Sequence, residues 1–114
     1  MSMESSADSW PETVEAGTIV RLYCGAGHTE DDMRAVLNWW REYLDGATLI
    51  PAYDIWKGQQ ENSVIVEIIG GGVDFHDLVT KLYPVMQEFL REFNEQEIMA
   101  AIYTSPVATV KREV

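Results

Sequence analysis

The sequence pattern that most constrains the fold is a strand, a glycine-rich turn and a helix start, and it occurs twice. The first copy, residues 21–29, has the letters RLYCGAGHT. The second copy, residues 67–76, has the letters EIIGGGVDFH and follows about 45 residues later. Because each copy closes an apolar stretch and opens a helix, the repeat predicts a doubled β-α-β unit.

The chain of 114 residues is long enough to bury a core as one domain without metals or disulfides. Residues 1–16 are polar and acidic and include Pro11, so we expect a flexible tail there and a single domain over 17–114. Cys24 is the one cysteine, which excludes an internal disulfide. The sequence has no signal-peptide pattern and no apolar run that could span a bilayer, and it therefore predicts a cytoplasmic protein.

The net charge of −11 arises from 19 acidic and 8 basic residues. Contacts to phosphates need clustered Lys and Arg, so direct binding to nucleic acid or to an anionic membrane surface is not expected. Two interpretations of the acidity stay open. It either keeps the protein soluble, as in a salt-rich cytoplasm, or it mimics a nucleic acid and binds a basic protein partner.

Hydrophobic periodicity predicts strands at residues 18–24, 47–56, 63–69 and 97–104, with the polar run 57–62 turning the chain between the second and third. Thr29 caps the first helix, with Asp32 completing a capping box and Gly46 ending the helix. The second helix is expected to start near Asp74. Two prolines add constraints: Pro51 places the second strand at a sheet edge, and Pro84 kinks or restarts the second helix.

The order β-α-β-β-α-β predicts an α+β fold, a ferredoxin-like βαββαβ sandwich. We expect a four-stranded antiparallel sheet in the order 4-1-3-2 with two helices on one face. The first and third strands are expected to be parallel neighbours, so that both glycine-rich turns meet at one edge of the sheet.

That shared edge is the first candidate ligand site. Glycines let backbone N–H groups approach a ligand at a helix start, although they also simply permit tight turns. The acidic run 30–32 counts against a phosphate ligand. The candidate ligand-binding residues are Cys24, Gly25, Gly27, His28, Gly70, Gly71, Gly72, Asp74 and His76.

The only Cys and His residues, namely Cys24, His28 and His76, fall in the same two turns. A Cys–His pair could activate a thiolate, and the three together with Asp74 could hold zinc. The alternative is a small apolar core cysteine with two solvent-exposed histidines. We therefore assign no catalytic residue, no metal and no cofactor.

The sheet face opposite the helices is the second candidate surface, because alternation gives it too many apolar side chains to face water. Arg21 and Glu67 are expected to pair on it, and Tyr53 or Trp56 to join it. We expect a homo-oligomer, dimer or trimer, through this face, unless it is a ligand cleft or is covered by the tail or by residues 107–114. Its residues are Ile19, Arg21, Tyr23, Ile65, Glu67, Ile69, Met99 and Tyr103, with Ala101 among them.

Three segments resemble the PII/CutA-like branch of ferredoxin-like proteins: GAT at 46–48, WKG at 56–58 and SVIVEII at 63–69. The resemblance covers about residues 18–104 and implies a trimer that packs sheet faces together, with small ligands in the clefts between subunits. Unlike PII proteins, this sequence has no long loop between the second and third strands and no basic residues to hold nucleotide phosphates.

The sequence thus predicts a small, soluble, non-catalytic oligomeric module that binds a small ligand or regulates a partner. Two alternatives are an acidic phage- or plasmid-type inhibitor that binds a basic protein, and a small enzyme that uses Cys24, His28 or His76.

Overall fold

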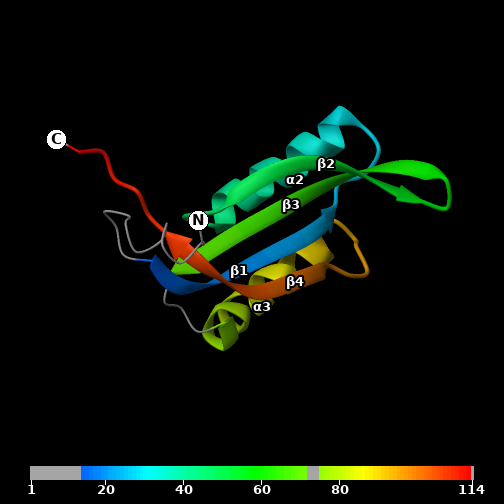
Figure 1. Cartoon of the computed structure of the whole chain (residues 1–114). Helices are drawn as coiled ribbons and strands as arrows, with labels where there is room; N and C mark the ends of the chain where they lie inside the picture. Colours follow the sequence, from blue (N-terminus) through cyan, green and yellow to red (C-terminus); the bar gives the residue numbers. More distant parts are fainter. Residues whose placement is uncertain (1–13, 72–74, 114) are drawn as a thin grey trace.

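The computed structural model describes residues 14–71 and 75–113. The elements are β1 (Val14–Gly25), α2 (Glu30–Tyr43), β2 (Thr48–Trp56), β3 (Gln59–Gly71), α3 (Phe75–Glu92) and β4 (Met99–Ala108). The strands form one antiparallel sheet in the order β2-β3-β1-β4, which reads β4-β1-β3-β2 from the other edge. Both helices lie on one face of it (Figure 1). The predicted α+β fold with a four-stranded antiparallel sheet and two helices is confirmed.

The core lies between that face and the helices. Alternate residues of β1 and β3 point into the core, as expected from the predicted alternation of side chains between the two faces of each strand. The aromatic rings of Trp40 from α2 and Phe89 from α3 stack at 5.5 Å between centroids and are fully buried. The other buried apolar residues are Val20, Leu22, Cys24, Ala26, Val36, Val64, Val66 and Leu82.

β1 and β3 run antiparallel, so the prediction that they are parallel is wrong. Gly25 at the end of β1 pairs with Ser63, and Thr18 near its start pairs with Gly70. The reason is the hairpin: the helical crossover makes β1 and β2 point the same way, and a tight turn then reverses the chain into β3. The two glycine-rich turns therefore lie at opposite ends of the sheet.

The β2–β3 hairpin is longer than predicted. Its turn is only Lys57 and Gly58, with φ angles of 51° and 75°, the positive pair that a two-residue type I′ turn requires. Residues 59–62, expected to turn the chain, instead pair with residues 53–56. The hairpin tip projects beyond the rest of the sheet (Figure 1).

The outer strands also extend past their predicted ends. β1 begins at Val14, so residues 14–16, assigned to the tail, pair with residues 106–108 of β4. β4 continues through Pro106 because it is an edge strand, where a missing N–H breaks no ladder. Pro51 likewise lies on an edge strand, as predicted. The remainder of the predicted tail, residues 1–13, lies outside the described residues.

α2 begins as predicted. The Thr29 hydroxyl accepts a hydrogen bond from the Asp32 N–H at 3.0 Å, and the Asp32 carboxylate accepts the Thr29 N–H at 3.1 Å. The helix ends at Tyr43 with Leu44 as its cap, before Gly46.

α3 runs through Pro84 without the expected restart. Pro84 is exposed, so the carbonyl freed by its missing N–H can be hydrated. Asp74, the expected start of this helix, lies outside the described residues. Neither this helix nor any other in the described part of the chain is long and apolar enough to cross a membrane.

Candidate functional site: an acidic, aromatic cleft

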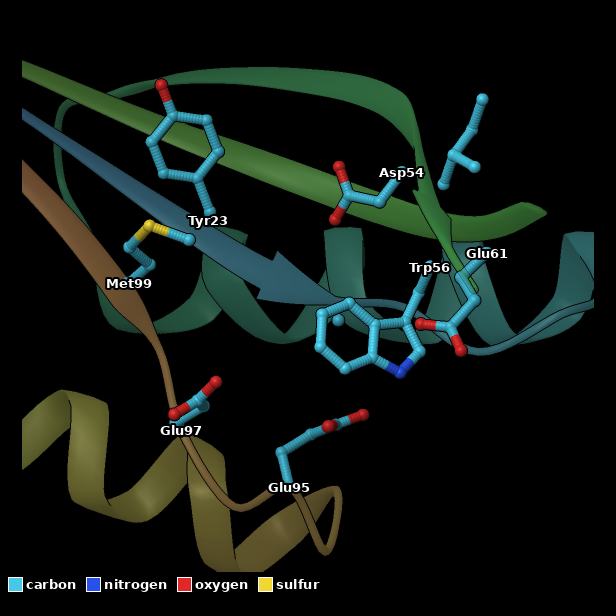
Figure 2. A pocket seen from close by; sticks show the side chains of 9 residues that line it. Tyr23, Asp54, Trp56, Glu61, Glu95, Glu97 and Met99 are labelled. Atoms are coloured by element: carbon cyan, nitrogen blue, oxygen red, sulfur yellow. The ribbon is translucent and has the colours of Figure 1, made fainter. Parts of the chain in front are cut away.

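A cleft of about 510 Å3 opens at the end of the sheet where β1 stops. Its lining residues come from four segments: β1, the β2–β3 hairpin, the connection between α3 and β4, and the start of β4 (Figure 2). A volume of this size is in the range of small-molecule sites. The lining residues are Tyr23, Gly25, Asp54, Ile55, Trp56, Glu61, Glu95, Glu97 and Met99.

The hairpin register places two carboxylates of the cleft directly opposite each other. Asp54 on β2 pairs with Glu61 on β3, and Figure 2 draws the Glu61 carboxylate beside the indole of Trp56. Like charges opposite each other on adjacent strands destabilise a sheet. The arrangement therefore costs stability unless a cation lies between or near the two groups.

Glu95 is held in place by the end of α3. Asn94 adopts φ 50°, its N–H donates to the Arg91 carbonyl at 3.4 Å, and the Glu95 N–H donates to the Leu90 carbonyl at 3.0 Å. This pair of bonds is a Schellman motif, which ends a helix and reverses the chain direction. It turns the Glu95 side chain back toward the end of β1.

The Glu95 carboxylate lies over Gly25. A Cβ atom built on Gly25 would lie 2.9 Å from Glu95 Oε1, so the missing side chain at this position creates the space for the carboxylate. Burial and the charge of Glu61 raise the pKa of Glu95 above its ordinary value. The carboxylates of Glu95 and Glu61 therefore repel each other electrostatically.

No Lys, Arg or His lies among the residues that line the cleft. The ion pairs within residues 14–71 and 75–113, such as Arg34 with Asp31, involve none of its four carboxylates. Trp56 contributes an exposed ring, and the Lys57 ammonium lies 5.8 Å from its centroid. Negative charge beside aromatic rings is a setting that favours an organic cation.

Of the ligand-binding residues proposed from the sequence, Gly25 alone is among the described residues that line this cleft, and the proposed interface residues Tyr23 and Met99 line it as well. Gly27 and His28 are close by: a Cβ on Gly27 would clash with the side chain of Asp32, and the His28 N–H donates to that carboxylate at 3.0 Å. Gly70 and Gly71 end β3 at the far end of the sheet, and His76 opens α3 after them. Gly72 and Asp74 lie outside the described residues. The predicted shared edge does not exist.

Cys24, His28 and His76 do not form a cluster, because the two histidines follow turns at opposite ends of the sheet. Burial raises the pKa of the Cys24 thiol to about 12, which leaves it protonated at neutral pH. Over the described ranges, no three Cys, His, Asp or Glu residues are grouped so that they could hold a metal ion. The cysteine is a core residue.

The open face carries the predicted ion pair: Arg21 Nε donates to Glu67 Oε2 at 2.7 Å. The pKa of Arg21 is raised, chiefly by that hydrogen bond and also by Tyr103. Trp56 has the register of this face, whereas Tyr53 has the register of the other. Residues 109–113 leave the sheet instead of covering this face (Figure 1).

Four acidic residues of the cleft were missed from the sequence: Asp54, Glu61, Glu95 and Glu97. Among 19 acids no single residue stands out, and only the register of the hairpin brings the first two together. The one sequence signal for Glu95 is the preceding asparagine, a residue that adopts positive φ more readily than most and often follows a helix end.

No model of a known protein family matches this sequence, and no curated protein is similar enough to match it. Solved structures do match its fold. One is a phage SAM lyase in complex with S-methyl-5'-thioadenosine, at 18% identity, with 85% of this chain and 93% of that chain covered and a TM-score of 0.56. Another is a phage SAM lyase in the apo state, at 19% identity, with 86% and 94% covered and a TM-score of 0.58.

At this level of identity the likeness establishes the fold. It also corrects the functional prediction, because the proteins that share the fold are lyases and therefore enzymes. The expected non-catalytic module is contradicted by this likeness.

Proposed function

We propose that this protein is a lyase that cleaves S-adenosylmethionine (SAM) in the cleft at the end of β1. The observation that carries the proposal is the lining of that cleft: four carboxylates and two aromatic side chains, with no basic residue. The fold shared with phage SAM lyases supports the same reaction class.

The chemistry of SAM matches this lining. SAM carries a positive sulfonium sulfur and an ammonium group, and both are attracted by carboxylates in a partly desolvated cleft. The rings of Trp56 and Tyr23 provide faces for the sulfonium and for the adenine. Ligands with phosphates, by contrast, would be repelled.

The charges of the cleft also favour turnover. When the bond between sulfur and Cγ of the amino-acid arm breaks, its electron pair stays on sulfur, and the sulfonium becomes the neutral thioether S-methyl-5'-thioadenosine. The carboxylate of the same arm forms the new bond to Cγ, so that the arm leaves as a lactone. The carboxylates then lose their electrostatic attraction for the nucleoside, so the product binds more weakly than the substrate. Because the positive charge is present in the ground state and decreases in the transition state, these carboxylates contribute to substrate binding more than to the chemical step.

The strand order β4-β1-β3-β2 supports the assignment to the ferredoxin-like sandwiches. We also propose that the open face is the interface of a homo-oligomer. Ile69 is 52% exposed and Met99 is 70% exposed on it, and Met99 also lines the cleft. Sedimentation that gives a monomer at all concentrations would contradict this interface.

The direct test is to incubate the purified protein with SAM and to follow S-methyl-5'-thioadenosine by liquid chromatography and mass spectrometry. We expect its release at a rate proportional to the protein concentration. The same SAM in buffer, and with heat-denatured protein, gives the background.

A rate no higher than this background, with a folded protein, would contradict the proposal. Charge reversal of two cleft residues, E61K together with E97K, is expected to abolish the release. The matched variant E42K on the outer surface of α2 should retain it, since Glu42 is exposed and lies outside the cleft.

A further inference from the structure

A second, smaller cavity adjoins the cleft. It measures about 170 Å3 and lies between the start of α2 and the end of α3. Such a volume is below the range of a complete small-molecule site but suits one arm of a larger ligand. Its lining residues are Gly25, Ala26, Gly27, Asp32, Ala35, Val36, Phe93 and Glu95.

The two cavities meet at Gly25 and Glu95, which line both. The glycine has no side chain to divide them, and the carboxylate lies over it. The smaller cavity therefore adjoins the cleft at Glu95, next to any ligand that fills the cleft.

The walls of the smaller cavity have two different characters. Ala35, Val36 and Phe93 provide an apolar side that suits methylene groups. Asp32 provides charge, and its Oδ2 accepts the N–H groups of His28 and Thr29. These hydrogen bonds hold the carboxylate in a fixed orientation, and they also lower its pKa.

We propose that the smaller cavity is the subsite for the aliphatic, ammonium-bearing amino-acid arm of the sulfonium ligand, with Glu95 at the junction beside the sulfur. This proposal rests on the proposed function, because it divides one SAM molecule between the two cavities. The methylene groups lie against Phe93 and Val36, and the ammonium group faces Asp32. The carboxylate of the arm finds no basic side chain on either lining and stays in solvent.

A substitution that fills the smaller cavity tests whether one SAM molecule is divided between the two cavities. Ala35 is exposed on α2, so A35L adds an isopropyl group at the cavity wall without disturbing the core, and leucine is a good helix former. Three ligands are titrated by calorimetry: SAM, S-adenosylhomocysteine and S-methyl-5'-thioadenosine. The first two have the amino-acid arm, and the third lacks it. N38L, an exposed position of the same helix outside both cavities, is the matched control.

We expect A35L to weaken the binding of the two ligands with the arm by about tenfold or more and to leave the affinity for S-methyl-5'-thioadenosine unchanged. N38L should retain all three affinities. Equal weakening of all three by A35L, or no change in any, would overturn the subsite while leaving the proposed function in place. A wild-type protein that binds none of the three would overturn the proposed function itself, and the subsite with it.

Discussion

The two faces of the sheet carry similar apolar side chains but have different surroundings. On the covered face, Val20 and Leu22 are almost completely buried beneath the helices. On the open face, Ile69 and Met99 alternate with them in the same sheet and remain exposed. Strand alternation therefore determines which residues share a face, whereas the connections between strands determine what covers it. One face provides stability, and the other is available for binding.

The largest effect on the free energy of unfolding is expected from a substitution in the covered face. Replacing Trp40 by alanine removes a fully buried ring that stacks on Phe89, and should lower the free energy of unfolding by about 3–5 kcal/mol. The matched change on the open face, I69A, should cost no more than about 0.5 kcal/mol in the monomer. Chemical denaturation of both variants measures the difference.

The stability cost of the same two variants should depend differently on the protein concentration. If the open face forms the interface of an oligomer, the cost of I69A grows with protein concentration while that of W40A in the core changes little. A large cost for I69A that is independent of concentration would show that the open face is covered within one chain, contrary to our comparison.

The covered face was also the part of the molecule that the sequence predicted best. Period-two alternation in β1 and helical periodicity around Trp40 report directly on burial, and a single period is enough to identify them. The direction of β3 was harder to predict. It depends on a two-residue turn at Lys57 and Gly58, whereas the polar residues that follow predict a longer loop.

The cleft could not be predicted for a similar reason. Its residues lie on four segments, and only pairing across the hairpin and the Schellman motif at Asn94 bring Glu61 and Glu95 to one place. The glycine repeat correctly predicts the two turns, but it wrongly predicts that they lie close together. Gly25 proved to matter because it leaves room for Glu95, a contact that no local pattern reveals.

A smaller effect is expected at the cleft, where the open face ends. E61Q and E97Q each remove one negative charge from the lining of the cleft. If the cleft binds SAM as proposed, each should raise KM for SAM by about three- to tenfold, with kcat nearly unchanged. Steady-state release of S-methyl-5'-thioadenosine gives both constants, and E42Q on α2 is the control. A fall in kcat of about a hundredfold or more without a change in KM would show instead that the carboxylate takes part in proton transfer.

The smallest effect concerns the pH dependence of stability, and it distinguishes the helix start from the cleft by sign. Hydrogen bonds from His28 and Thr29 lower the pKa of Asp32 below its ordinary value of 3.8, so its contribution is present at higher pH and is lost as the pH falls. Burial and Glu61 raise the pKa of Glu95 above 4.5, so its contribution is present at low pH and is lost as the pH rises. Relative to the wild type, D32N should therefore become less stable, and E95Q more stable, as the pH increases from about 3 to about 7. Denaturation midpoints across this range measure both trends. Parallel curves for E95Q and the wild type would show that the Glu95 carboxyl does not experience the charge of Glu61, which would contradict the electrostatic repulsion that we assign to these two residues.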